Sequence, residues 1–193
     1  MIEITREQAK NAFFMLKWMR SSAALKISNT LRERKCVVAD LQIILSCSQP
    51  EASQQLARLR RFGLVERKKE GKFVQYSLAE KFDSVNEDAF NFKEDTGVSL
   101  KEALHLLGDD VTYDILTYVQ NNSNTTVAPI YGNLKIEQAV CSKFLGFLRA
   151  KQLVLATRKG KYVHYTINAS LLEKISKITE KILLNNGSDN ISE

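Results

Sequence analysis

The chain has 193 residues, of which 44% are hydrophobic and 26% charged, and its formal net charge is +6. It contains no run of about 18 apolar residues and no charged-then-apolar leader, so we expect neither a membrane span nor a signal peptide. The three cysteines are odd in number and show no pairing pattern, which predicts a reducing, cytoplasmic environment. The positive charge suits either a polyanionic partner or an ordinary solvated surface.

The sequence repeats itself without a gap at a fixed offset, which is 89 residues from Gly71 to Gly160 (160 minus 71). A period of this length indicates two copies of one small domain rather than a solenoid. We therefore predict a first domain over residues 1–97, a second over residues 98–186, and a disordered tail over residues 187–193. The first-copy residues that recur in the second include Val38, Ala39, Leu45, Gln49, Ser53, Leu56, Leu59, Arg60, Leu64, Val65, Gly71, Lys72, Val74 and Tyr76.

The first copy combines helices with a hairpin. A capping box of Thr5 and Gln8 opens the first helix, and further helices are predicted over residues 24–34 and 38–46. Ser48 and Glu51 form a second capping box, which opens a helix that ends near Gly63. The apolar period then changes from 3.6 to 2, which predicts a hairpin over residues 64–78 that turns through residues 69–71.

The second copy repeats this order after a connecting helix that ends near Gly97. A capping box of Ser99 and Glu102 is expected to open its first helix. Helices are predicted over residues 112–119, 128–134 and 137–150, and a hairpin over residues 153–167 that turns at Lys159 and Gly160. A last helix begins near Asn168, and its apolar residues have the spacing of a seam for a partner helix. They are Leu171, Ile175, Ile178 and Ile182.

This order of elements is typical of a winged helix-turn-helix, in which the second helix of the turn lies in the major groove and the basic hairpin, or wing, contacts phosphates. The predicted fold class is therefore mainly α with small β-hairpins (α+β), as two tandem winged helix-turn-helix domains in a pseudo-dimeric arrangement. In the first copy a helical wheel places Gln54, Arg58 and Arg61 opposite the apolar stripe, with Ser53 and Arg60 beside them. Gln and Arg side chains match adenine and guanine edges. The wing carries Lys68, Lys69 and Lys72, which suit phosphates.

The first copy resembles the ArsR-type family of bacterial transcriptional regulators. The resemblance rests on Ala39-Asp40-Leu41, on the Ser-Gln-Pro-x-x-Ser-x-x-Leu element of residues 48–56, and on Gly63-Leu64-Val65 with Gly71-Lys72. In the second copy, residues 103–109 running into Ile115-Leu116 resemble the first-helix signature of the family. The resemblance implies dimeric, repressor-like winged-helix proteins that bind two half-sites of an operator. It also implies that four residues of the first recognition helix face DNA, namely Gln49, Ser53, Gln54 and Gln55.

The sequence departs from the family pattern in two ways. The Cys-x-Cys of metal-sensing members would fall at Val37 and Ala39, and Cys36 lies one residue away. Cys36, Cys47 and Cys141 have no close spacing, so we expect no metal site and no cofactor. The second departure is the tandem arrangement, in which the copies have diverged. The face of the second recognition helix that corresponds to the polar face of the first consists of Lys143, Gly146, Phe147 and Ala150. The second wing stays basic, with Arg158, Lys159 and Lys161.

The sequence thus predicts a DNA-binding transcription regulator whose partner is double-stranded DNA, with a possible homodimer through the terminal helices and no membrane contact. The alternative is a tandem winged-helix adaptor that binds proteins through the apolar second recognition helix, including Phe144 and Phe147. No enzyme is expected, since neither copy shows a Ser/His/Asp cluster, a glycine-rich phosphate loop or a paired-carboxylate motif. The predicted DNA-binding residues are Gln49, Ser53, Gln54, Gln55, Arg58, Arg60, Arg61, Lys68, Lys69, Lys72, Lys143, Arg158, Lys159 and Lys161.

Overall fold

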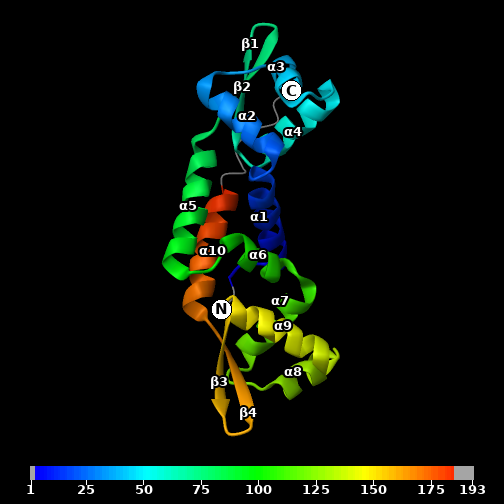
Figure 1. The fold of residues 1–193 in the computed structure, drawn as a ribbon, viewed down its shortest axis with the longest axis vertical. Helices are drawn as coiled ribbons and strands as arrows, with labels where there is room; N and C mark the ends of the chain where they lie inside the picture. The colour runs from blue at the N-terminus through cyan, green and yellow to red at the C-terminus, as the bar shows by residue number, and fades with distance from the viewer. Residues whose placement is uncertain (1–2, 185–193) are drawn as a thin grey trace. The chain divides into compact units, whose positions relative to one another are not determined.

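The computed structural model describes residues 3–184, so the predicted tail over residues 187–193 lies outside the described residues. The fold is mostly helical with two small antiparallel hairpins, as predicted (Figure 1). Within residues 3–184, no helix combines the length and the apolar character that crossing a membrane requires. In chain order the elements are α1 (Arg6–Met19), α2 (Ser22–Glu33), α3 (Val38–Leu45), α4 (Gln49–Arg61), β1 (Val65–Glu70), β2 (Phe73–Leu78), α5 (Glu80–Thr96), α6 (Leu100–Gly108), α7 (Asp110–Asn121), α8 (Val127–Leu134), α9 (Gln138–Ala150), β3 (Val154–Lys159), β4 (Tyr162–Ile167) and α10 (Ala169–Leu184).

By its internal contacts the chain divides into two compact units. We call them the 14–88 unit, which holds most of the first copy and also residues 182–184, and the 89–181 unit, which holds most of the second copy and also residues 3–13. The division falls inside α1, after Phe13, inside α5, after Asp88, and inside α10, after Lys181. These limits do not follow the repeat boundary at residues 97 and 98, and where the domains begin and end stays a prediction.

The two copies share their local geometry at the offset of the sequence repeat. Hairpin β1–β2 pairs Val65 with Leu78 through to Glu70 with Phe73, and β3–β4 pairs Val154 with Ile167 through to Lys159 with Tyr162. An isolated bridge joins Cys36 to Tyr76 in the first copy and Thr125 to Tyr165 in the second. The backbone turns to positive φ at equivalent places too, at 64° in Gly63 and at 56° in Gln152. The repeat is therefore a repeat of structure as well as of sequence.

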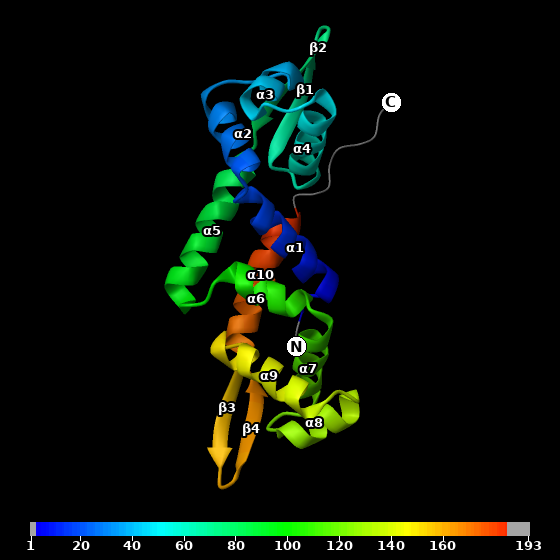
Figure 2. The same ribbon diagram turned by 45° about the vertical axis from the view of Figure 1, so that its right-hand side comes forward.

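Each unit has its own apolar core, and the copies bury equivalent residues. In the 14–88 unit, Leu41 of α3 and Leu56 of α4 are at most 1% exposed. Their equivalents in the 89–181 unit, Ile130 and Leu145, are equally buried. The equivalent helices therefore bury equivalent residues in both copies, and in each copy the hairpin extends past them (Figures 1 and 2).

Two details differ from the sequence expectation. The hairpin turns consist of Gly71-Lys72 and Gly160-Lys161, one residue later than predicted, so Lys69, Glu70 and Lys159 belong to strands. Glycine suits the first turn position because the backbone has a positive φ there, which is 62° at Gly71. The predicted capping box at Ser99 is wrong, because the Ser99 side chain makes no capping hydrogen bond. Glu102, its expected partner, instead accepts a hydrogen bond from Lys151 Nζ over 2.8 Å.

Candidate nucleic-acid interface

Helix α4 begins at a cap built by its own first turn. The Ser48 amide donates to Glu51 Oε2 over 2.8 Å, and the Glu51 amide donates to Ser48 Oγ over 3.4 Å. Pro50 stands in the first turn, where its missing amide hydrogen costs no helical hydrogen bond. The hydrogen bonds from the backbone and side chain of Ser48 lower the pKa of the Glu51 carboxyl. The predicted capping box is confirmed, and it fixes the start of α4 beside the turn from α3.

The two faces of α4 divide as helical periodicity predicts. The inner face is formed by Ala52, Leu56 and Leu59, which are at most 1% exposed. The outer face carries no acidic side chain after Glu51, and its arginines lie toward the end of the helix, where cations interact favourably with the helix dipole. The predicted DNA-binding residues that are exposed on α4 are Gln49, Ser53, Gln54, Arg58, Arg60 and Arg61.

Gln55 differs from the other predicted residues of α4 because its side chain is half-buried. Its Oε1 accepts a hydrogen bond of 3.1 Å from Trp18 Nε1 at the end of α1. Gln55 also lines a hollow of about 200 Å³ together with Cys47 and Lys26, which is smaller than a typical ligand pocket. The carbonyl oxygen that would take part in a bidentate contact with adenine is thus already bonded within the protein. Gln55 therefore links α4 to α1, and we leave it out of the proposed base contacts.

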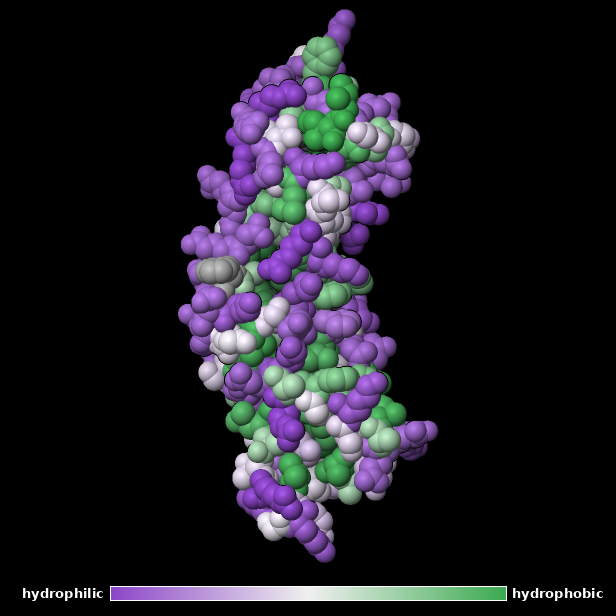
Figure 3. All heavy atoms as spheres, viewed as in Figure 1, coloured by the Kyte–Doolittle hydropathy of each residue, from purple (hydrophilic) through white to green (hydrophobic). Residues whose placement is uncertain are grey.

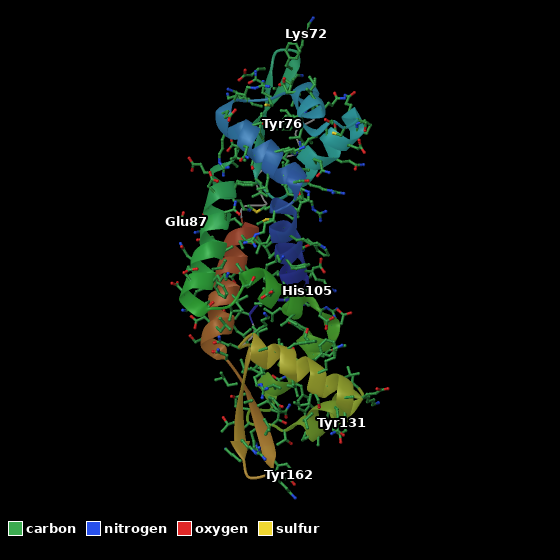
Figure 4. All side chains as sticks on the ribbon, viewed as in Figure 1. Lys72, Tyr76, Glu87, His105, Tyr131 and Tyr162 are labelled. Carbon is green, nitrogen blue, oxygen red and sulfur yellow. The ribbon has the colours of Figure 1, made fainter. Side chains whose placement is uncertain are left out.

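The wing of the first copy carries the predicted lysines at and near its tip, and Lys72 points away from the strands (Figure 4). Lys68, Lys69 and Lys72 are exposed, but their charges are not equally available. Lys68 Nζ lies 3.5 Å from Glu70 Oε1, and Lys35 Nζ lies 3.9 Å from the same oxygen. Within residues 3–184, Lys69 and Lys72 have no such ion pair. Glu70 therefore partly neutralises Lys68 and leaves the other two lysines free.

The sequence analysis missed Arg67, which is an exposed cation on β1 opposite Tyr76. The signal for it was present, because the period of 2 along a strand places Arg67 on the same face as Lys69. With Arg67 included, the hairpin carries four cations and two carboxylates. Hydrophilic side chains accordingly gather around its tip (Figure 3).

The equivalent face of the second copy is less polar. Lys143 of α9 is exposed and holds its Nζ 5.8 Å from the centre of the Phe147 ring, a cation–π contact. Phe147 is 46% exposed, and Phe144 meets it edge to face with ring centres 6.1 Å apart. Helix α9 thus presents an aromatic pair and two cations, Lys143 and Arg149, where α4 presents glutamines and three arginines.

The second wing has three exposed cations, and each has a partner within the same unit. Arg158 Nε donates to the Gly160 carbonyl over 3.2 Å, and Lys159 Nζ donates to Asn124 Oδ1 over 3.5 Å. Lys161 Nζ lies 5.2 Å from the centre of the Tyr162 ring. None of these partners is a carboxylate, so the positive charge of this wing is not neutralised by them.

Two of the three cysteines, Cys36 and Cys141, are buried and placed for packing. Within residues 3–184, no group of three or more His, Cys, Asp or Glu side chains is arranged to hold a metal ion. Cys36 and Cys141 are buried, and this burial raises the pKa of both thiols. A protonated thiol is a poor metal ligand and nucleophile, and Cys141 fills the core position that Ala52 has in the first copy.

Known proteins resemble the part of the chain that holds this site. The family described as "Bacterial regulatory protein, arsR family" matches residues 21–67, which contain α2, α3, α4 and the start of β1. The biofilm growth-associated repressor of Agrobacterium fabrum is 35% identical over 74 residues, which are 38% of this chain and 63% of that protein. The transcriptional activator HlyU of Vibrio cholerae is 39% identical over 77 residues, which are 40% of this chain and 70% of that protein.

Solved structures give corresponding matches. HlyU from Vibrio cholerae is 35% identical with a TM-score of 0.35, over 40% of this chain and 86% of that one. An ArsR-like transcriptional regulator from Rhodococcus is 23% identical with a TM-score of 0.40, over 43% of this chain and 77% of that one. The capped helix-turn-helix with its hairpin defines a bacterial regulatory protein, and the chain belongs to the arsR family.

Proposed function

We propose that this protein is a sequence-specific, DNA-binding regulator of transcription whose helix α4 enters the major groove. The observation that carries the proposal is the outer face of α4, where Gln54 and Arg58 are exposed one helical turn apart. Forked amide and guanidinium donors at that spacing suit adenine and guanine edges. Gln49 and Ser53 lie in the first turns of the helix, which contact bases in helix-turn-helix proteins.

The first wing supplies the complementary phosphate contacts in this proposal. Lys69 and Lys72 have free ammonium groups, and Arg60 and Arg61 extend the same charge along the end of α4. Such contacts fix the protein on the duplex without reading its sequence. Since one relative is named a repressor and the other an activator, the proposal concerns operator binding and not the direction of control.

We further propose that the second copy is also a winged helix-turn-helix domain and that the two domains, over residues 1–97 and 98–186, form a pseudo-dimer within one chain. The equivalent hairpin registers, bridges and positive φ positions support this reading of residues 98–186. Lys143, Arg158, Lys159 and Lys161 would then contact the DNA backbone, because α9 has fewer forked polar side chains on its outer face than α4.

A homodimer through the terminal helices stays a prediction, and α10 lends it little support. Three of the four residues of the predicted seam, Leu171, Ile175 and Ile182, are at most 5% exposed, so residues of this chain already cover them. If two chains pair, their half-sites would lie about one helical turn apart on DNA, roughly 34–36 Å.

An adaptor function is the second candidate, and the exposed ring of Phe147 favours it. Exposed aromatic residues with small neighbours, here Gly146 and Ala150, are common at protein contacts. An adaptor function does not explain the exposed arginines and lysines of the first copy, so we favour DNA binding over it.

The decisive experiment selects duplexes from genomic DNA with the purified full chain and then measures affinity by fluorescence anisotropy. The double variant Gln54→Ala/Arg58→Ala should bring the affinities for selected and scrambled duplexes closer by about 30-fold or more, because each of the two lost base contacts is worth about 1 kcal/mol or more. The matched control is Asn86→Ala, an exposed residue of α5, which should leave the ratio unchanged. No binding to any duplex, or binding insensitive to salt, would refute the proposal and favour the adaptor.

A further inference from the structure

The second copy has a hollow of about 270 Å³ at the place where β4 runs into α10 (Figure 1). Buried Val119 of α7 and Leu172 of α10 give it an apolar lining, and Ser123 and Thr166 add hydroxyl groups. All its described lining residues belong to the 89–181 unit. Since a water molecule takes about 30 Å³ in the liquid, the hollow has room for about nine non-hydrogen atoms. It is therefore large enough for a small organic molecule.

The hollow has an excess of negative charge. Glu3 and Glu173 line it, and none of its described lining residues is Lys or Arg. Lys177, one turn further along α10, donates to Glu173 Oε1 over 2.6 Å. This hydrogen bond raises the pKa of the Lys177 ammonium, and the charge of Glu3 adds to the rise. One lysine thus serves two carboxylates, and Glu3 forms no ion pair within residues 3–184, so the hollow favours a cation.

The repeat identifies the first-copy residues that correspond to this hollow. The buried residues of α2 and α7 correspond at an offset of 88, because the connection after α7 is one residue longer than the connection after α2. Gln120, which lines the hollow, is therefore the equivalent of Arg32 (120 minus 32). Leu172, at the later offset of 89, is the equivalent of Asp83 (172 minus 83). The buried residues are Ala24, Ile27, Ser28 and Leu31 in α2, and Thr112, Ile115, Leu116 and Val119 in α7.

In the first copy a guanidinium occupies this position. Arg32 Nη2 donates a hydrogen bond to Asp83 Oδ1, which joins α2 to α5. The second copy has lost both charges of this pair, since Gln120 and Leu172 stand at the equivalent positions. It has gained the carboxylate of Glu173 next to Leu172, where the first copy has a serine. The second copy therefore keeps an anionic surrounding but lacks the guanidinium that would match it.

An organic cation suits the hollow better than a metal ion does. Among the residues that the structure describes, no three His, Cys, Asp or Glu side chains are grouped to hold a metal. The apolar lining of Val119 and Leu172 suits a short carbon chain. A guanidinium is the cation whose planar donors match a carboxylate in two hydrogen bonds, and it is the group that the first copy itself places here.

We propose that this hollow of the second copy binds a small alkylguanidinium compound, whose guanidinium is held by Glu3 and Glu173 at the position equivalent to Arg32. Its carbon chain lies against Val119 and Leu172. The site involves no DNA, so it is independent of the proposed DNA-binding function. The second copy thereby gains a ligand-binding role that the first copy, with its own arginine in place, lacks.

The test titrates the full chain, labelled with nitrogen-15, with agmatine at constant ionic strength and follows the amide signals by NMR. Agmatine is an alkylguanidinium of about the size of the hollow. Signals of residues 119–123 and 166–173 should shift and reach saturation. The uncharged compound (4-hydroxybutyl)urea has the same number of non-hydrogen atoms and should leave these signals unchanged, because it offers no cation to the carboxylates.

Variants of the lining residues separate this site from general attraction of cations. Glu3→Gln and Glu173→Gln should each weaken agmatine binding about fivefold, as the loss of an exposed ion pair does. Glu180→Gln removes an exposed carboxylate of α10 that does not line the hollow, and it should have no effect. Gln120→Arg restores the arginine of the first copy and should abolish binding, whereas the uncharged Gln120→Met should retain it. Circular dichroism melting verifies that each variant is folded.

Three results would overturn the inference. They are the absence of saturable shifts in residues 119–123 and 166–173, equal shifts with the uncharged urea, and equal binding by Glu173→Gln and Glu180→Gln. Retention of binding by Gln120→Arg would show that agmatine binds elsewhere and would overturn it too. No arm of this test uses DNA, so its failure leaves the proposed DNA-binding function untouched, and absence of DNA binding leaves this site untouched.

Discussion

The ion pair between Lys68 and Glu70 gives the sharpest prediction for the first wing. Lys68 Nζ lies 3.5 Å from Glu70 Oε1, and the two side chains are 74% and 40% exposed. Exposed pairs of this kind contribute only about 0–1 kcal/mol to folding, so Glu70→Gln should leave stability almost unchanged. Its effect on DNA binding should be larger, because the variant removes the carboxylate that Lys68 and, at 3.9 Å, Lys35 share, and Lys68 near the hairpin tip becomes free to contact a phosphate.

The size of the effect follows from counterion release. Each phosphate contact adds about −0.9 to the slope of log affinity against log salt. Taking 1 M salt as the reference, one added contact raises affinity about fivefold at 0.15 M salt. Glu70→Gln should therefore steepen the slope by about 0.9 and tighten binding about fivefold, which titrations by fluorescence anisotropy at four or five salt concentrations would resolve.

Glu66→Gln is the matched control. It removes the same charge from the same strand and the same face of the hairpin, but Glu66 has no ion pair with another residue of the described part of the chain. Its effect should be well below that of Glu70→Gln. Equal effects of the two variants would show that overall charge, and not the release of Lys68, controls binding. No change with Glu70→Gln would show that Lys68 does not contact phosphate.

Two further predictions concern contacts inside each unit. Trp18→Phe removes the hydrogen bond to Gln55 and should lower the free energy of unfolding in urea by about 1 kcal/mol. If this hydrogen bond stabilises the fold, Gln55→Leu should lower the free energy of unfolding less in the Trp18→Phe variant than in the unmodified protein. An equal decrease in both proteins would contradict the prediction. The hydrogen bond from Lys151 lowers the pKa of the Glu102 carboxyl in the folded protein. The carboxylate therefore stabilises the fold fully at any pH above its unfolded pKa of about 4.3. This stabilisation is lost as the pH falls through the lower pKa of the folded protein. The melting temperature of Glu102→Gln should accordingly lie below that of the unmodified protein at pH 7 and approach it in strong acid, whereas a difference independent of pH would exclude the ion pair as its cause.

The parts of the fold that depend on neighbouring residues were predictable from the sequence. The capping box of Ser48 and Glu51 involves four consecutive residues, and the change from a period of 3.6 to one of 2 after Gly63 is a local signal. The repeat extended these predictions to the second copy, where α8, α9, β3 and β4 fall near the predicted ranges.

Contacts between distant residues account for what the sequence analysis got wrong. Glu102 was predicted to cap α6, but its side chain accepts a hydrogen bond from Lys151, 49 residues away. Gln55 lies at the flank of the helical wheel, and only the position of Trp18, 37 residues earlier, decides that it points inward. The sequence analysis did not predict that Phe73 and Tyr162 at the hairpin tips are exposed, at 66% and 55%. Alternation along a strand predicts which face a ring occupies but not whether anything covers that face.

The backbone bridge between Cys36 and Tyr76 has a mechanical consequence. Two backbone hydrogen bonds of 3.0 and 2.8 Å join these residues, so the segment before α3 holds the hairpin near its base. Beyond this bridge, the four residues from Gln75 to Lys72 form a free arm of about 14 Å. A tilt of about 10° at the base would displace the end of the arm by about 2 Å, which is more than the range of about 0.5 Å over which a hydrogen bond to a phosphate holds. A small displacement of the segment before α3 would therefore produce a larger displacement of the hairpin tip.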